Sequence, residues 1–297
     1  MGRRAIGRPW TALLSLTPLW AIVVLVYFGT TFWTAQISLT DSHLLPTGHF
    51  IGLGQYGRLF ATQTWQISIQ NLLILLILVV GGCLVLGFLL AAALDRAVRF
   101  ENSFRTIFLY PYALSFVVTG LVWQWLMNPD LGIQATFHQL GLTWFVFDWT
   151  MHRETAIYAV ALAGIWQGSG LVMVLMLAGL RGIDQDIWRA ARIEGIPVHR
   201  IYRSIVLPQL TPTIATAVTI LAMGVIKTFD LVIALTNGGP GTSTVVPAKF
   251  IMDNLFGRQN LALATAGAMV MLLTVLAVVV PLAYAQNVRA ARQRNAL

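Results

Sequence analysis

The sequence predicts an all-α polytopic membrane protein with six transmembrane helices. Of its 297 residues, 57% are hydrophobic and only 10% are charged, whereas a soluble domain carries about 25% charged residues. The mean hydropathy is +0.75. Six apolar stretches are each about 20 residues long or longer, enough to cross roughly 30 Å of hydrocarbon as a helix. Residues 1–297 are therefore predicted to form a single transmembrane domain with spans at about 13–35, 68–94, 106–127, 155–180, 213–235 and 261–286.

The first span follows a basic start that contains Arg3, Arg4 and Arg8. A cleavable signal peptide begins in the same way, but this apolar run is longer than a signal-peptide core and no clear small-residue cleavage site follows it. A retained helix is therefore predicted. The mixed segment 36–67 predicts an external loop, and a short charged loop at 95–105 follows the second span.

The third span contains Pro111, which predicts a kink that neighbouring helices must accommodate. The external segment 128–154 that follows is rich in aromatic residues, namely Trp144, Phe145, Phe147 and Trp149. Such residues are typical of a membrane-interface belt, an interpretation favoured here over stacking on a sugar. The polar loop 181–212 joins the fourth and fifth spans, and a basic tail follows the sixth.

Basic residues are divided unequally between the two sides of the membrane. The N-terminus, the 95–105 loop, the 181–212 loop and the tail together hold Arg3, Arg4, Arg8, Arg96, Arg99, Arg105, Arg181, Arg189, Arg192, Arg200, Arg203, Arg289, Arg292 and Arg294. The opposite side holds Arg58, Arg153, Lys249 and Arg258. By the positive-inside rule, both termini and the 181–212 loop are cytoplasmic. The net charge of +8 is thus a topology signal and does not indicate nucleic-acid binding.

The stretch 189–208 reads RAARIEGIPVHRIYRSIVLP. Asp184 suits the N-cap of a helix before it, and Gly195 suits the left-handed residue that ends that helix. Pro197 can open a second helix, and Pro208 is expected to follow its end. A helix, a sharp corner and a helix are predicted outside the bilayer, where small side chains let another surface approach closely. This is the pattern of a docking element.

No motif for catalysis or for a cofactor is present. The lysines are Lys227 and Lys249, and neither follows a glycine, so no phosphate-binding G-K-[ST] motif is possible. If ATP drives this protein, ATP and Mg²⁺ are bound by another chain. The histidines are scattered without metal-ligand spacing, and Cys83 has no partner for an internal disulfide. The sequence predicts a non-enzymatic chain without a metal site.

Two polar features interrupt the spans. Lys227 and Asp230 are the charged residues well inside a span, and at i, i+3 they can face each other along one helix. A structural pair and a polar path both remain open for them. Near the middle of the fourth span, Trp166, Gln167 and Gly168 break the apolar run. Close helix packing and contact with a sugar, through an aromatic face and an amide, both remain open there.

The 189–208 stretch resembles the EAA loop of binding-protein-dependent ABC importer permeases, whose pattern is roughly E-A-A-x-x-D-G-A, then an aromatic residue and L-P. The matching residues are Ala190, Ala191, Gly195, Leu207 and Pro208. The differing residues are Arg189 for Glu, Glu194 for Asp, Ile196 for Ala and Tyr202 for Phe. In that family the loop seats in a groove of the cytoplasmic ATPase and transmits its closure. The resemblance implies an ATPase-coupling role for these positions, without the salt bridge that the usual Glu would make.

A second motif supports the same resemblance. Residues 236–240 read TNGGP after the pair Phe229 and Asp230, which is similar to the T-x-G-G-P segment of sugar-type permeases, most of all the maltose/glucose-type family. The resemblance implies a type I importer permease (MetI-like) fold in a bacterial or archaeal inner membrane. It implies a second homologous permease subunit, two ATP-binding subunits, an extracytoplasmic solute-binding protein and a sugar substrate.

In the maltose-type member of this family, sugar lies between the helix before the docking loop and the helix after it. Carried onto this chain, those contact positions are Gln167, Gly168, Leu171, Leu221, Val225 and Thr228. With Trp166, Lys227 and Asp230 they form the predicted substrate pathway. The predicted function is a permease subunit of an ATP-driven sugar importer that supplies half of the translocation route. An ion-coupled secondary transporter, with Lys227 and Asp230 as its relay, is the alternative, and a membrane scaffold is a third.

Overall fold

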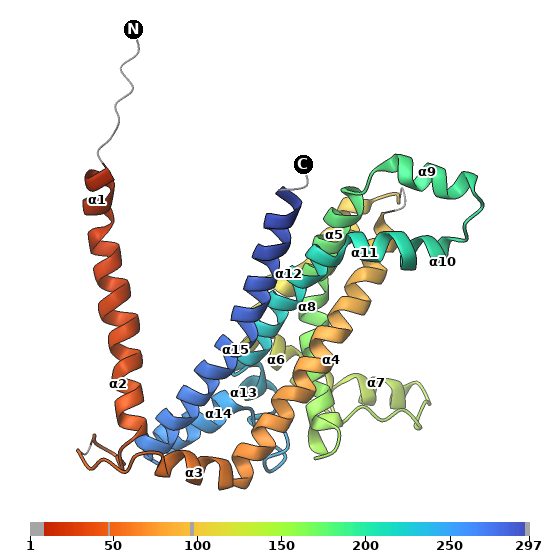
Figure 1. Cartoon of the computed structure of the whole chain (residues 1–297). Helices are drawn as coiled ribbons and strands as arrows, with labels where there is room; N and C mark the ends of the chain where they lie inside the picture. Colours follow the sequence, from red (N-terminus) through yellow and green to blue (C-terminus); the bar gives the residue numbers. More distant parts are fainter. Residues whose placement is uncertain (1–8, 47, 96–97, 295–297) are drawn as a thin grey trace. The chain divides into compact units, whose positions relative to one another are not determined.

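A computed structural model describes residues 9–46, 48–95 and 98–294 of the chain, and within these ranges the regular secondary structure is helical (Figure 1). Close contacts divide these residues into two units. One comprises the described residues up to Ala61 together with Ile251–Leu272, and the other comprises Thr62–Phe250 together with the described residues from Leu273. Each unit is considered by itself below.

The first unit contains the N-terminal helix. Helix α1 (Pro9–Ile22) continues through a π-helical segment (Val23–Phe28) into α2 (Gly29–Ser38), and the predicted span 13–35 lies within this run. The stretch Leu16–Ser38 is apolar, and none of its most hydrophobic window is buried within the protein. Helix α3 (Gly54–Ala61) follows.

A long C-terminal helix, α15 (Leu261–Arg294), begins in this same unit, and its N-terminal part Leu261–Ala277 is apolar. The amide of Ala262, at its start, donates to the carbonyl O of Ser42 at 2.8 Å.

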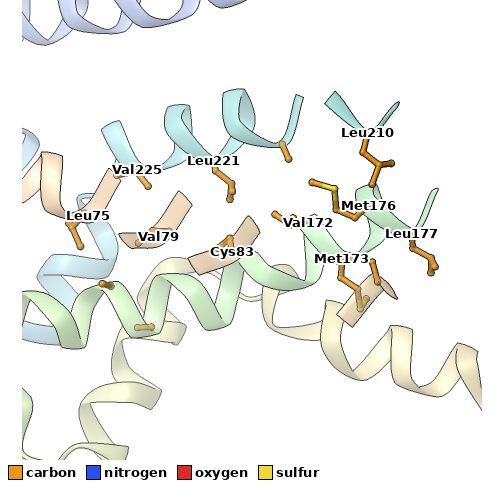
Figure 2. Close-up of a cluster of buried hydrophobic side chains, with 14 of the residues drawn as sticks. Leu75, Val79, Cys83, Val172, Met173, Met176, Leu177, Leu210, Leu221 and Val225 are labelled. Atoms are coloured by element: carbon orange, nitrogen blue, oxygen red, sulfur yellow. The ribbon is translucent and has the colours of Figure 1, made fainter. Parts of the chain in front are cut away.

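The second unit is built on two long helices packed side by side, α4 (Gln63–Leu94) and α8 (Ala156–Arg181) (Figure 1). Both helices lack proline and are apolar over most of their length. Their sequences therefore do not show which face of each helix is buried. Glycine lets them approach: a Cβ on Gly87 would lie 2.7 Å from side-chain atoms of Val172. Helix α12 (Thr211–Ile226) packs on both. Buried side chains from these helices form a shared hydrophobic core, which includes Leu75, Val172 and Leu210 (Figure 2).

The predicted third span is not one kinked helix. Helix α5 (Glu101–Ala113) and helix α6 (Phe116–Leu126) meet at an angle of 101°. Pro111 lies inside α5, where it lacks an amide hydrogen for the last turn. The chain then becomes extended at Ser115, whose hydroxyl accepts a hydrogen bond from the amide of Val118 at 3.2 Å and caps α6. The break at residues 114–115 therefore replaces the expected kink.

The predicted fifth span is also divided. Helix α12 ends at Ile226, where the amides of Lys227 and Thr228 bond three residues back and tighten its last turn. Helix α13 (Asp230–Thr236) then begins a new segment. The expectation that Lys227 and Asp230 face each other along one helix is wrong, because the helix ends between them. At its other end, α12 meets the preceding helical segment at 69°.

Length and composition identify three described helices that can cross a membrane, or up to five if each bent pair is one span. The predicted second and fourth spans correspond to α4 and α8. The remaining short elements are α7 (Ile133–Gln139), a 3₁₀ turn (Trp149–Met151), α14 (Pro247–Met252) and a π-helical segment (Asp253–Gly257).

Candidate functional site

A cavity of about 470 Å³ lies in the second unit, between α4, α8, α12, α13 and the break after α5. It brings together most of the predicted pathway residues from helices that are far apart in the sequence. Those that line it are Gln167, Gly168, Leu171, Leu221, Val225, Thr228 and Asp230. Leu114 and Ser115 also line it, so the break between α5 and α6 forms part of the wall.

The cavity wall is apolar with a few polar groups. Thr228 donates from its hydroxyl to the carbonyl O of Gly224 at 3.2 Å. Gln167 is only 4% exposed, and its Nε2 donates to the carbonyl O of Leu114 at 2.8 Å. Asp230 is exposed at the first turn of α13, where a negative charge suits the helix dipole. Apolar walls with a few oriented polar groups are typical of small-molecule sites.

Gly168 sets the spacing of the helices at this level. A Cβ on it would lie 2.9 Å from Sγ of Cys83 on α4 and 3.3 Å from Cδ2 of Leu221 on α12. Figure 2 shows Cys83 and Leu221 approaching this part of α8. The small residues of the fourth span therefore serve close packing, and the same approach brings α12 to the cavity.

Two predicted pathway residues lie outside the cavity lining. Trp166 packs edge-to-face on Trp123 of α6, with ring centroids 5.9 Å apart. Lys227 is exposed at the end of α12. The ion pairs of the described residues do not include one between Lys227 and Asp230. The structure therefore separates this pair, and of the two residues only Asp230 reaches the cavity.

A second feature is the helical hairpin formed by α9 (Gln185–Ile193) and the helical run made of α10 (Val198–Ile201), a π-helical segment (Tyr202–Val206) and α11 (Leu207–Gln209). It lies at the end of α8 opposite α7 (Figure 1). The carboxylate of Asp184 accepts a hydrogen bond from the amide of Asp186 at 2.9 Å, which confirms the predicted N-cap.

Gly195 forms the corner of the hairpin. Its φ of +66° is left-handed, as predicted. The amide of Ile196 donates to the carbonyl O of Ala191 at 3.0 Å, which is the six-to-one bond of a Schellman motif. Pro197 is extended and precedes α10. The expectation that Pro208 follows the end of the second helix is wrong, because Pro208 lies inside α11, within the same helical run.

Aromatic rings hold the hairpin together and fix it to α4. Trp188 of α9 packs on Tyr202 with centroids 5.5 Å apart, and Tyr202 packs on Phe88 of α4 at 5.9 Å. Ala191 on α9 and Ile201 on α10 are buried and belong to the hydrophobic core of this unit. Sequence reasoning missed Trp188 and Phe88, although the apolar spacing of Ile187, Trp188 and Ala191 on α9 could have indicated this inward face.

The outward face of the hairpin carries most of the predicted ATPase-coupling residues. Ile196 and Tyr202 are half-buried and Ala191 is buried, whereas the exposed members are Arg189, Ala190, Glu194, Gly195 and Pro208. The guanidinium of Arg189 lies 3.1 Å from the carboxylate of Asp186 on the same helix. This local pair is exposed, so its contribution to stability is small.

The ends of α5 and α8 are joined by an ion pair that sequence reasoning also missed. Arg181 at the end of α8 lies 2.8 Å from Glu101 and 4.0 Å from Asp95. The opposite charges of these residues, at the ends of predicted spans, could have indicated the pair. This partly exposed pair links the end of α8, next to the start of the hairpin, to the start of α5.

The TNGGP segment is a packed turn that closes α13. Asn237 ends the helix with a left-handed φ of +51°, and the hydroxyls of Thr236 and Thr244 lie 2.7 Å apart. Thr244 also donates to the carbonyl O of Gly239 at 2.9 Å. Gly238 has a left-handed φ of +86°, which favours glycine, and a Cβ on it would lie 2.8 Å from Cε of Lys249.

Among the described residues, no cluster of His, Cys, Asp and Glu could hold a metal ion. What identifies the chain is its likeness to known proteins. Residues 84–293 match the family described as the binding-protein-dependent transport system inner membrane component. The chain belongs to this family. It is therefore a multi-pass inner-membrane permease and a non-catalytic transport component.

Relatives match the permease over nearly its whole length. A probable ABC transporter permease protein of Pyrococcus horikoshii is 40% identical over 95% of this chain and 97% of its own. The xylose/arabinose import permease protein XacH of Haloferax volcanii is 34% identical over 91% of this chain and 87% of its own.

A solved structure shares the fold. It is a chain of a bacterial ABC transporter involved in the import of the acidic polysaccharide alginate, and it matches with a TM-score of 0.80 and 19% identity. The match covers 95% of this chain and 96% of that one. This likeness concerns the all-helical permease fold alone.

Proposed function

We propose that the permease is one of two membrane subunits of an ATP-driven sugar importer, and that the cavity is its half of the sugar route. The observation that carries the proposal is the lining of the cavity. Its polar side chains include the Tyr112 phenol, the Ser115 hydroxyl, the Gln167 amide and the Asp230 carboxylate. Hydroxyl, amide and carboxylate groups exchange hydrogen bonds with sugar hydroxyls, and apolar walls pack on sugar C–H surfaces. The xylose/arabinose relative supports a sugar.

The route is completed by partners. A solute-binding protein delivers the sugar from outside, as the family description implies, and a second homologous permease lines the other half. The chain crosses the membrane six times with both termini in the cytoplasm. This topology follows from the charge distribution, with the bent α5–α6 pair and the divided α12–α13 segment each taking the place of one continuous span.

The hairpin of α9 to α11 is the proposed docking element for the ATP-binding subunits. Its outward residues, including Arg189, Ala190 and Glu194, are exposed, and its inward rings bear on α4. ATP and Mg²⁺ are held by those partner subunits, because this chain has no phosphate-binding motif. When the ATPases close, the hairpin moves as one body and shifts the helices around the cavity. Such a shift requires contacts that differ between the two states.

The geometry of the structure does not favour the alternative, an ion-coupled transporter. It needed Lys227 and Asp230 on one face of a helix, and the helix ends between them. Family membership also points to a transport system with a binding protein.

The test combines sugar identification with uptake. The binding protein is purified from cells, its bound sugar is identified by mass spectrometry, and uptake of that radiolabelled sugar is compared with and without the permease gene. We expect uptake to be lost on deletion and restored by the wild-type gene. Uptake that survives deletion, or that persists without ATP but collapses with the proton gradient, would refute the proposal.

A further inference from the structure

A second cavity lies where α6 and α13 end. Its volume is about 420 Å³, and its lining includes Trp125 of α6 and Asn237 after α13. Small-molecule sites span roughly 300–1,000 Å³. The same two helices line the first cavity at their starts, through Phe116 and Asp230, and roughly 13 Å of helix separates Phe116 from Trp125 at about 1.5 Å per residue. This second cavity, the outer pocket, therefore follows the first along the same helices, on the external side in the proposed topology.

The outer pocket is lined by neutral groups. Its polar side chains are the amides of Gln124, Asn128 and Asn237 and the hydroxyls of Thr150 and Thr236. None of the described residues that line it is charged. Amides and hydroxyls both donate and accept hydrogen bonds, as the hydroxyls of a sugar do, whereas an ionic ligand would meet no opposite charge in this lining. The chemistry therefore fits a neutral ligand with several hydroxyl groups.

The amides of the outer pocket are available to a ligand. Gln124 and Asn237 are exposed, and their side-chain amides make no hydrogen bond within the described part of the chain. The side-chain oxygen of Asn128 accepts from the amides of Asp130 and Leu131 at 2.9 and 3.0 Å, so its NH₂ group remains to donate. The backbone of Asn237 is fixed as the left-handed cap of α13. Hydrogen-bonding groups on a fixed backbone lose less entropy when a ligand binds.

Trp125 adds an exposed aromatic ring to this lining. It is 73% exposed, whereas the ring of Trp123, two residues earlier, packs on Trp166. An apolar ring in contact with water is unfavourable, and the C–H face of a sugar can cover such a ring while the sugar hydroxyls keep their hydrogen bonds. An exposed tryptophan also fits a membrane-interface anchor, which is the alternative that the experiment separates.

We propose that the outer pocket is an entry site that holds a neutral monosaccharide between its release from the binding protein and its arrival in the first cavity. The ring of Trp125 covers one face of the sugar, and the amides of Gln124 and Asn237 bond to its hydroxyls. The inference rests on the proposed function, which makes the ends of α6 and α13 external and a sugar the cargo. Because these three residues are exposed, binding is weak and readily reversed, as a site that passes its ligand on requires.

The direct test measures sugar binding to the whole transporter in lipid nanodiscs, without nucleotide and without the binding protein. The probes are D-glucose and D-xylose, and saturation-transfer-difference NMR detects weak binding of either. Trp125→Ala removes the ring. Asn237→Gly removes the amide and keeps the cap of α13, since glycine favours a left-handed conformation. Trp144→Ala is the matched control, because Trp144 is 75% exposed and lies outside the lining of the outer pocket.

The wild type should bind both sugars. Affinity should fall roughly 2- to 10-fold in Trp125→Ala and in Asn237→Gly, the effect of losing one ring contact or one hydrogen bond, and should stay unchanged in Trp144→Ala. Wild-type affinity in both pocket variants would place the sugar elsewhere and overturn the inference, as would a wild type that binds neither sugar. An equal loss in Trp144→Ala assigns the effect to membrane anchoring and also overturns it.

A transport measurement tests the entry role and separates it from the proposed function. The whole transporter in proteoliposomes is supplied with its binding protein and the radiolabelled sugar identified on it, and the amount of sugar moved per ATP hydrolysed is measured. Asn237→Gly should lower this ratio several-fold, because a sugar that is not held at the entry escapes before it reaches the first cavity, while Trp144→Ala keeps it. An unchanged ratio in Asn237→Gly overturns the entry site and leaves the proposed function standing. A wild type that moves no sugar overturns both.

Discussion

At the scale of single residues, the absence of a side chain decides how closely α8 is approached. Gly170 is the extreme case, because a Cβ built on it would overlap the carbonyl O of Phe108 on α5. Main-chain atoms cannot change rotamer as a side chain can. A methyl group at Gly170 would therefore require α5 and α8 to move apart. Gly81 of α4, in contrast, has no atom within 4 Å of such a Cβ.

These two glycines make a matched pair of substitutions. Gly170→Ala should lower the free energy of unfolding by about 1–3 kcal/mol through overpacking. Gly81→Ala should be neutral or stabilising by up to about 1 kcal/mol, since alanine favours a helix interior. Thermal unfolding of the purified transporter in detergent measures both. Equal melting temperatures for the two variants would contradict the close approach of α5 to α8.

At the scale of elements, the hairpin of α9 to α11 combines a corner fixed by backbone geometry with arms fixed by rings. A Cβ on Gly195 would meet no atom within 4 Å, so a substitution at this corner acts through φ alone. The arms depend on the contact of Trp188 with Tyr202. The two features are independent and are tested separately.

The corner predicts a graded response at Gly195. Gly195→Val forces a β-branched residue into a left-handed conformation, costs roughly 1–2 kcal/mol, and should reduce ATP hydrolysis stimulated by the loaded binding protein. Gly195→Asn is the control, because asparagine tolerates this conformation. ATPase assays on the reconstituted transporter provide the measurement. If valine and asparagine behave alike, the shape of the corner does not matter for coupling.

The ring contact predicts that Trp188→Ala loosens the hairpin while Trp188→Phe largely retains it. Edge-to-face pairs contribute about 0.5–1.5 kcal/mol beyond the area that they bury. Hydrogen exchange of the α9 amides should accelerate several-fold in the alanine variant. Unchanged protection in Trp188→Ala would show that other contacts hold the arms together.

Sequence reasoning succeeded where a local rule decides the outcome. The left-handed corner at Gly195 and the cap at Asp184 follow from backbone sterics and hydrogen bonding within a few residues. It failed at the breaks near Leu114 and Lys227, because Pro111 is also compatible with a kinked helix and Lys227 and Asp230 with a charge pair on one continuous helix. At Leu114, a tertiary hydrogen bond from Gln167 accompanies the helix end. Family resemblance, rather than composition, located six of the residues that line the cavity, namely Gln167, Gly168, Leu171, Leu221, Val225 and Thr228.

At the scale of the whole molecule, the distribution of charge predicts which surfaces face the cytoplasm. The hairpin and the segment that contains α7 lie at opposite ends of α8 (Figure 1). The proposed topology places the hairpin inside the cell and the α7 segment outside. His152 and Arg203 are exposed positions on these two surfaces.

A labelling experiment follows from this topology. A membrane-impermeant maleimide added to intact spheroplasts should react with His152→Cys and not with Arg203→Cys, which should react only after the membrane is permeabilised. The buried Cys83 gives no background. Labelling of Arg203→Cys from outside would reverse the orientation and remove the hairpin from the reach of a cytoplasmic ATPase.

The ring of Phe88, on which the hairpin bears, lies near one end of α4, and Trp65 near the other end packs on Phe250 with centroids 5.1 Å apart. Roughly 35 Å of unbroken helix separates Phe88 from Trp65, at 1.5 Å per residue. A continuous helix of this length can transmit a movement from one end to the other. In the proposed topology, a movement of an ångström or two at the cytoplasmic end of α4 would be transmitted, without any hinge in between, to the buried Trp65 near its external end.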